Sequence, residues 1–150
     1  MLLQKMEHIM TTRLEHANIV VRDIDSTISF LRAAFPDFQV RREWSDEGRR
    51  CLHIGNDDTY IALNESTVEP VEKWQPYTGK PGVNHLGYEV DDVNALRKRL
   101  LAAGFPDTTY PNNHPHRKRV YFNDAEGNDW EFVQYLSDVT AERNDYELSD

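Results

Sequence analysis

The sequence predicts an α+β fold made of two similar halves, and an internal repeat is the first observation that supports it. The stretch "LEHANIVVRDIDSTISFLRAAF", from residue 14, resembles "VNHLGYEVDDVNALRKRLLAAGF", from residue 83. His16 aligns with His85, 69 positions later, and Leu31 aligns with Leu100 in the same register. A register that holds over this length indicates a duplicated unit. The second observation is that, in each half, alternating apolar residues give way to a helical stripe and then to short strands.

The first half begins with a strand over residues 13–21, followed by a helix for which Asp23 or Asp25 is a plausible N-cap. This helix should stop at Pro36, because proline cannot continue a helix. Its apolar stripe contains Ile24, Ile28, Leu31 and Phe35. Strands are expected to follow over residues 38–44, 50–54 and 59–63.

The second half repeats this order, with a strand around His85 that runs into a helix capped by Asp91 or Asp92. Gly104 should end the helix, as glycine often does just beyond the last turn. The apolar stripe of this helix contains Val93, Leu96, Leu100 and Ala103. Further strands are expected over residues 119–122 and 129–135.

These elements divide the chain into two modules with flanking segments. The linker between the modules is rich in proline and glycine, and the C-terminal tail is rich in carboxylates and is expected to be mostly solvated. The parts are an N-terminal arm (1–12), the first module (13–68), the linker (69–82), the second module (83–136) and the tail (137–150).

Composition excludes several classes of protein. Hydrophobic residues make up 39% and charged residues 29%, which is typical of a globular protein rather than a disordered one. The net charge of −9 argues against a nucleic-acid partner, and the apolar stretches are too short for a membrane span. The start of the chain lacks the apolar region of a signal peptide. Cys51 is the single cysteine, which favours a reducing, cytoplasmic location.

Three side chains of the repeat have the chemistry of a metal site. Because side chains alternate along a strand, His16 and His85 should both point away from the side covered by the helices. Glu131 lies between Trp130 and Phe132, so its carboxylate should lie on the face opposite these large apolar groups. Two imidazoles and one carboxylate form a facial triad, which binds a divalent ion and leaves positions open for substrate.

The stretches "LEHANIVVRD", "VNHLGYEVDDV" and "VYFNDAEGNDWEFVQY" resemble the vicinal oxygen chelate superfamily. It includes glyoxalase I, extradiol dioxygenases, fosfomycin-resistance transferases, methylmalonyl-CoA epimerase and metal-free bleomycin-binding proteins. The resemblance spans residues 13 to 136. It implies two tandem βαβββ modules that form an open, barrel-like cleft, with the metal ligands on His16, His85 and Glu131.

Two details of this resemblance bear on the reaction. In glyoxalase I a second glutamate stands where this chain has Ala62, which cannot coordinate a metal. The stretch "NNHPHRKRVYFNDAEGNDWE" is similar to the extradiol dioxygenase signature and would give catalytic roles to His114 and Tyr121, although Ala125 replaces a proline. Those enzymes have a further histidine on the strand before "IAL", where "DDTY" stands here, and His53 is assigned to another part of the pattern.

The remaining candidates concern substrate binding. The basic run "HPHRKR" offers Arg117 and Arg119 as binders of an anionic group and His116 as a further catalytic residue, while Tyr60 and Asn64 share the face of position 62.

The expected cofactor is one divalent ion, Fe(II), Mn, Zn, Ni or Mg. The expected function is a metal-dependent enzyme acting on a small substrate through neighbouring oxygens, with a preference for extradiol-type dioxygenation. The alternatives are a lyase, isomerase or thiol transferase with a redox-inert ion, and a metal-free antibiotic-binding protein. A homodimer is expected, and the modules can pair within one chain or across two.

Overall fold

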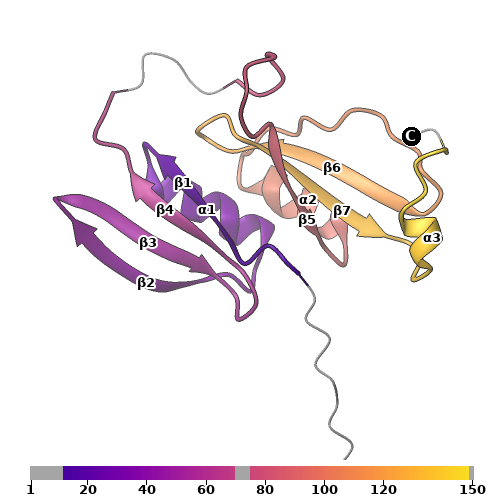
Figure 1. The fold of residues 1–150 in the computed structure, drawn as a ribbon, viewed down its shortest axis with the longest axis horizontal. Coiled ribbons are helices and arrows are strands. Elements are labelled where there is room, and N and C mark those ends of the chain that lie inside the picture. Colours follow the sequence, from indigo (N-terminus) through magenta and orange to yellow (C-terminus); the bar gives the residue numbers. More distant parts are fainter. Residues whose placement is uncertain (1–11, 70–74, 149–150) are drawn as a thin grey trace, which may run out of the picture.

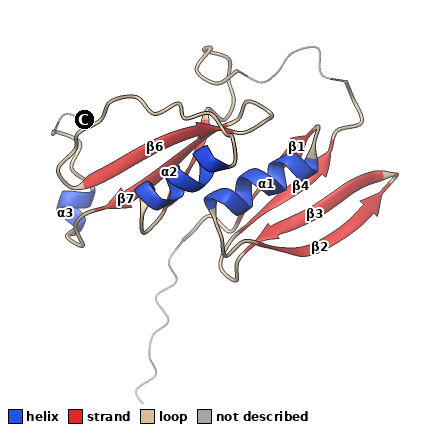
Figure 2. Ribbon diagram, turned by 180° about the vertical axis from the view of Figure 1, so that it is seen from behind, coloured by secondary structure: helices blue, strands red, loops and turns tan. Residues whose placement is uncertain are grey.

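The fold consists of two sheets that lie side by side, each with a helix on the same side of the molecule (Figures 1 and 2). The computed structural model describes residues 12–69 and 75–148, so the predicted N-terminal arm and part of the linker lie outside the described residues. The elements are β1 (His16–Val21), α1 (Ile24–Ala34), β2 (Gln39–Asp46), β3 (Arg49–Gly55), β4 (Tyr60–Glu65), β5 (His85–Glu89), α2 (Val93–Ala102), β6 (Arg117–Asn123), β7 (Asp129–Tyr135) and α3 (Thr140–Arg143). Within this described part, no helix combines the length and the apolar character needed to cross a bilayer.

The strand order confirms the α+β class with two sheets. The first sheet, sheet A, has the order β1-β4-β3-β2, and the second, sheet B, has the order β5-β7-β6. In each sheet the first strand pairs in parallel with the last strand of its module, and the hairpin strands pair antiparallel. At the turn between β3 and β4, a side chain on Gly55 would collide with the Thr59 carbonyl oxygen, so this tight turn requires glycine.

Local capping explains where the two main helices begin and end. Asp23 caps α1 by accepting from the Ser26 N–H, and Asp92 caps α2. At the end of α2, Gly104 has a φ of 84°, and the Phe105 N–H donates to the Leu100 carbonyl, as in a Schellman motif. The caps therefore fall on the residues that the sequence offered, with Asp23 and Asp92 taking the N-terminal positions.

The second module departs from the βαβββ pattern. Between α2 and β6 the chain forms one isolated bridge, Asp107 to Phe122, in place of a strand. Pro106, Pro111 and Pro115 fall in this segment, and proline has no N–H to donate to a strand ladder. Sheet B consequently has three strands where four were expected, and the segment curls along its outer edge.

One hydrophobic core joins the two modules. Phe30 of α1 packs on Trp130 of β7, with ring centroids 5.5 Å apart, and Phe35 packs on Tyr88 of β5 at 4.7 Å. The second module also binds both ends of α1. Glu126 accepts from two backbone N–H groups before the helix, and Arg99 donates to two carbonyls at its end. The helices therefore cover one side of each sheet and leave the other side open.

Candidate functional site

The open faces of the two sheets carry the predicted ligands. On β1 the side chains of His16 and Asn18 are exposed, whereas Ala17 and Ile19 pack against the core. On β5 the exposed positions include His85, and Glu131 of β7 lies on the same face. The alternation of side chains along each strand thus confirms that both histidines point away from the helices.

The repeat has a direct counterpart in the pairing of the strands. Asn18 of β1 lies opposite Ala62 of β4, and Gly87 of β5 lies opposite Glu131 of β7. Both pairs are related by the same shift of 69 residues. Ala62 and Glu131 therefore occupy equivalent places in the two sheets, and sheet A has a methyl group where sheet B has a carboxylate.

His85 and Glu131 form the centre of the candidate site. The Nε2 atom of His85 lies 3.0 Å from a carboxylate oxygen of Glu131. On the other side of the ring, Nδ1 lies 2.9 Å from the hydroxyl of Tyr77, and this hydroxyl donates to Asp129 at 2.8 Å. The Tyr77 ring is 60% exposed, but its hydroxyl end is turned toward the sheet, where burial and the hydrogen bond to Asp129 raise its pKa.

These contacts determine which nitrogen of His85 faces the Glu131 carboxylate. The Tyr77 hydroxyl has one hydrogen, which goes to Asp129, so it accepts the Nδ1–H of His85. Nε2 is then the ring nitrogen that faces Glu131 at 3.0 Å, where it can donate a hydrogen bond when it carries a proton and can bind a metal cation when it does not. An imidazole held through its other nitrogen is the usual arrangement of a metal-binding histidine. His85 and Glu131 therefore fit two of the ligand positions of a divalent ion.

Tyr121 of β6 forms the floor beside this pair. It lies directly opposite Glu131 in the ladder, and its hydroxyl is 3.1 Å from that of Tyr110, whose ring stacks on it. Burial and hydrogen bonding to Tyr110 and Glu131 raise the pKa of Tyr121, so it stays protonated near neutral pH. The Nη1 atom of Arg119 approaches Glu131 at 3.9 Å. The structure thus brings Tyr121 and Arg119 to the His85 and Glu131 pair.

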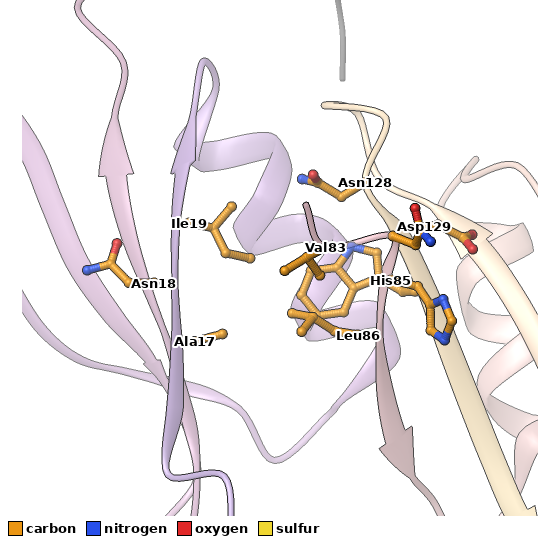
Figure 3. Close-up of a pocket in the computed structure, with 10 residues that line it drawn as sticks. Ala17, Asn18, Ile19, Val83, His85, Leu86, Asn128 and Asp129 are labelled. Atoms are coloured by element: carbon orange, nitrogen blue, oxygen red, sulfur yellow. The ribbon is translucent and has the colours of Figure 1, made fainter. Parts of the chain in front are cut away.

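His16 does not join this group within one chain. It belongs to sheet A, where its ring stacks on Tyr60 at 4.8 Å and its Nδ1 contacts Glu15. Within residues 12–69 and 75–148, no three His, Cys, Asp or Glu side chains converge closely enough to hold a metal. Between β1 and β5 lies a mostly apolar pocket of about 180 Å³, and in Figure 3 the His85 imidazole points away from β1.

The structure also identifies a histidine that sequence reasoning left aside. His53 lies on β3, the strand before β4, directly opposite Ala62 and with its ring 4.5 Å from that of Tyr60. Burial lowers the pKa of His53, and the nearby charges of His16, Arg42 and Arg41 act in the same direction. The stretch before "IAL" was taken for the preceding strand, but most of it forms the turn between β3 and β4. His53 could have been found from its pairing with position 62.

The repeat loses its register in the hairpins, which explains the omission. His53 pairs with Ala62, nine positions on, whereas Tyr121 pairs with Glu131, ten positions on. The hairpin of sheet B is therefore one residue longer, and His53 corresponds in space to Tyr121 rather than to Phe122. An alignment with a constant shift of 69 residues therefore matches residues of β3 with residues of β6 that lie on the opposite face of sheet B.

Other predicted residues lie near the C-terminal segment. His114 is buried and accepts the backbone N–H of His116 through Nδ1, while the His116 ring lies 3.7 Å from Glu142 of α3. Arg117 donates to a carbonyl of α3 and lies under the ring of Tyr146. The described part of the tail is mostly exposed, as expected, and Tyr146 contacts Arg117 while it stays 76% exposed.

The two remaining substrate candidates lie on sheet A with His16. Tyr60 is its cross-strand partner, and Asn64 donates to Asn18 at 2.6 Å. The predicted site residues therefore form two groups. Sheet A carries His16, Tyr60 and Asn64, and sheet B carries His85, Glu131, Tyr121, Arg117 and Arg119, with His114 and His116 beside them.

Comparisons with known proteins agree with this fold. A model of the Glyoxalase/Bleomycin resistance protein/Dioxygenase superfamily matches residues 13–132. A glyoxylase/bleomycin resistance protein/dioxygenase domain from Frankia sp. EAN1pec is 19% identical, with a TM-score of 0.71, covering 91% of this chain and 100% of that one. The fosfomycin resistance protein FosX from Listeria monocytogenes, in complex with Mn(II) and sulfate, is 18% identical, with a TM-score of 0.62 and coverage of 89% and 98%. FosX from Mesorhizobium loti is 19% identical, with a TM-score of 0.61 and the same coverage. A search of curated proteins finds no match.

Proposed function

Since this chain belongs to the glyoxalase/bleomycin resistance protein/dioxygenase superfamily, we propose that it is a metal-dependent enzyme whose substrate chelates a divalent ion through two neighbouring oxygens. The observation that carries the proposal is the His85 and Glu131 pair, with Nε2 and a carboxylate oxygen 3.0 Å apart and Nδ1 held by Tyr77. Superfamily members include Mn(II)-bound FosX from Listeria monocytogenes, which is consistent with a divalent metal in this fold.

The third ligand of the proposed site is His16 of a second subunit. His16 is far from a complete ligand set in its own chain, yet it stands on an open face, with its side chain 43% exposed. The same face exposes the large apolar side chains of Leu14 and Val20, which a partner would cover. A homodimer in which sheet A of one subunit faces sheet B of the other would complete two identical sites.

The residues around the site have distinct proposed roles. A bound divalent ion supplies Lewis acidity, and ferrous iron adds reactivity with O₂. Tyr121 is protonated and opposite Glu131, so it can donate a hydrogen bond to a substrate oxygen. Arg119 holds the Glu131 carboxylate in place. His116, beside Glu142 of the C-terminal segment, and His114, which accepts the His116 backbone N–H, are the further catalytic candidates. The lone thiol of Cys51, which is buried, suits a cytoplasmic enzyme.

Extradiol-type dioxygenation is the reaction that we favour within this class. The resemblance calls for a further histidine on the strand before β4, and β3 carries His53 on the face of His16. Tyr121 and Glu131, which the same signature names, lie side by side in sheet B. Reconstitution with Fe(II) under anaerobic conditions, followed by oxygen uptake with a panel of catechols, tests this version. Turnover supported by a redox-inert ion, with no oxygen uptake, would leave a lyase, isomerase or transferase.

The shared site can be tested without knowing the substrate. His16→Ala and Glu131→Gln should each lose bound metal, as measured by elemental analysis of the purified protein. Mixing the two variants after reversible unfolding should restore about one quarter of the wild-type metal, because half of the random dimers regain one intact site. No recovery would show that the ligands belong to one chain, and full metal binding by either variant would remove that residue from the ligand set. A wild-type protein that binds no divalent ion would favour a metal-free binding protein.

A further inference from the structure

An irregularity in β2 turns two consecutive arginines toward the open face of sheet A. Val40 pairs with Ile54 and Arg42 pairs with His53, so Arg41 is an extra residue in the ladder. A β-bulge of this kind breaks the alternation of side chains and re-aims the residues beside it. Val40 packs against the core, whereas the guanidinium groups of Arg41 and Arg42 both lie over rings of the open face.

The rings beneath these arginines form a row across the sheet, with one ring on each strand. His16 of β1 stacks on Tyr60 of β4 at 4.8 Å, Tyr60 lies 4.5 Å from His53 of β3, and His53 lies 5.0 Å from Trp44 of β2. The Arg41 guanidinium is 4.8 Å from the Tyr60 centroid, and that of Arg42 is 5.1 Å from the Trp44 centroid. Because the rings pack on one another, a ligand would meet their polar edges and the guanidinium groups.

The charge of these arginines is not neutralised by nearby carboxylates. Among the described residues, neither Arg41 nor Arg42 forms a salt bridge, and Arg41 donates to the uncharged carbonyl of Asn56. Other arginines of the same module, such as Arg13 and Arg49, each pair with an aspartate. On a chain with a net charge of −9, these two cations without a carboxylate partner give an excess of positive charge at the β2 end of the row, whereas Glu15 contacts His16 at the β1 end. The lowered pKa of His53 has these charges among its causes, after burial.

We propose that Arg41 and Arg42, beside His53, form an anion site, the β2 anion site, which binds a carboxylate, phosphate or phosphonate group of the substrate on the open face that also carries His16. This substrate class rests on the proposed metal-enzyme function, because it places the anionic group on the same open face as the proposed ligand His16. Guanidinium groups suit this ligand, since their planar donors match the two oxygens of a carboxylate or phosphonate. The site lies on sheet A, away from Arg117 and Arg119 of sheet B.

The β2 anion site can be tested by isothermal titration of the full chain with inorganic phosphate and, separately, with acetate at low ionic strength. Both titrations are made on the metal-free protein, so that the anion cannot bind through the ion. Arg42→Gln and Arg41→Gln should each weaken binding at least about tenfold, because each removes charge-assisted hydrogen bonds. Arg49→Gln is the matched control, since its guanidinium lies in the same sheet and pairs with Asp46 at 2.7 Å.

The outcomes separate the anion site from the metal proposal. Tighter binding of phosphate than of acetate would identify a phosphorylated or phosphonate substrate. Tighter binding of acetate would identify a substrate with a carboxylate group. Glu131→Gln should bind phosphate as the wild type does, even though it loses metal. If the wild type binds phosphate but no metal, the metal proposal fails and the anion site stands. The inference is overturned if the wild type binds neither anion, or if Arg49→Gln weakens binding as much as Arg42→Gln.

Discussion

The hydroxyl of Tyr77 determines how His85 presents its ring to Glu131. One hydrogen bond joins this hydroxyl to Nδ1 of His85 and another to Asp129. The chain of contacts fixes the tautomer and the orientation of the imidazole, as supporting residues do in established metal sites. Tyr77 has a positive φ of 64°, which is uncommon outside glycine, and this backbone conformation carries its side chain over the end of β5.

Removal of this hydroxyl should weaken metal binding without removing a ligand. We expect Tyr77→Phe to lower the affinity for Mn(II) or Zn(II) by about ten- to one-hundredfold, because His85 can then rotate and change tautomer. Competition titration against a chelating dye measures the effect. Tyr146→Phe is the control, because Tyr146 is 76% exposed and contacts Arg117 through its ring, which phenylalanine keeps. Equal affinities for the wild type and Tyr77→Phe would show that the hydroxyl does not support the site.

The placement of the proposed ligands on open faces was predictable from the sequence, whereas the contact of Tyr77 with His85 was not. Alternation along a strand places His16, His85 and Glu131 on open faces whatever the rest of the chain does. Tyr77 belongs to a linker without periodicity, so no local pattern indicates that it returns to β5. Asp129 is two residues before Glu131 and shares its face, which is a signal that the sequence did contain.

At the scale of secondary-structure elements, a charged capping residue determines where helix α2 begins. The carboxylate of Asp92 accepts the N–H groups of Asn94 and Ala95, both at 2.9 Å. The hydrogen bond from Ala95 is the main cause that lowers the pKa of Asp92 below its ordinary value of 3.8, and nearby lysines act in the same direction. Helix α2 begins at Val93 because the Asp92 carboxylate accepts backbone N–H groups of the first turn, which have no hydrogen-bond acceptor within the helix.

This cap should make part of the stability depend on pH. Because the folded pKa of Asp92 is lower than the unfolded one, its contribution is complete above about pH 4 and is lost as the pH falls through the folded pKa. Asp92→Asn keeps an acceptor but has no charge to lose. We expect the urea midpoint of the wild type to exceed that of Asp92→Asn at pH 7, and the difference to shrink or reverse at pH 3. A difference that stays constant between these values would contradict the charged cap.

The turn between β6 and β7 stabilises the start of α1 from the other module. Glu126 accepts the backbone N–H groups of Arg22 and Asp23 at 3.0 and 3.2 Å, and its side chain is 12% exposed. We expect Glu126→Ala to lower the free energy of unfolding by about 1–2 kcal/mol, as loss of a helix cap does. Asp57→Ala, which changes an exposed turn carboxylate, should have little effect. Urea denaturation compares the two variants, and an equal loss in both would deny Glu126 a capping role.

The boundaries of the helices were predictable where the sequence signal lies within a few neighbouring residues. Asp23 and Gly104 were identified as helix boundaries, and both lie where capping geometry requires. The bulge at Arg41 and the longer hairpin of sheet B were not predictable, because each shifts a ladder by one residue without changing the apolar pattern. The bulge places Arg41 and Arg42 over the rings of one face, and the longer hairpin places Tyr121, rather than Phe122, opposite Glu131.

For the whole molecule, the two modules share one core and leave two open faces. The internal repeat predicts that the chain forms two sheets. It does not indicate whether the open face of one sheet meets the other sheet of the same chain or a sheet of a second subunit. His16 lies on sheet A and His85 on sheet B, and the pocket between β1 and β5 is lined by Ala17 and Ile19 on one side and by His85 and Leu86 on the other (Figure 3). The way the modules combine therefore depends on contacts between sheets and between subunits, which no local periodicity records.

The shared core predicts that the modules unfold together. Phe30 is fully buried on α1, and its ring contacts Phe105, Trp130 and Phe132 of the other module. We expect Phe30→Ala to lower the free energy of unfolding by about 3–5 kcal/mol, because it leaves a cavity between the modules.

Amide exchange should then speed up in β4 and in β7 alike, since the cavity lies in the core that both sheets share. Leu101→Ala is the control, because Leu101 is 51% exposed on α2 and its loss should change stability little. Faster exchange confined to β4 would mean that the first module opens independently, and that the residues of α1 do not couple the two halves of the proposed site.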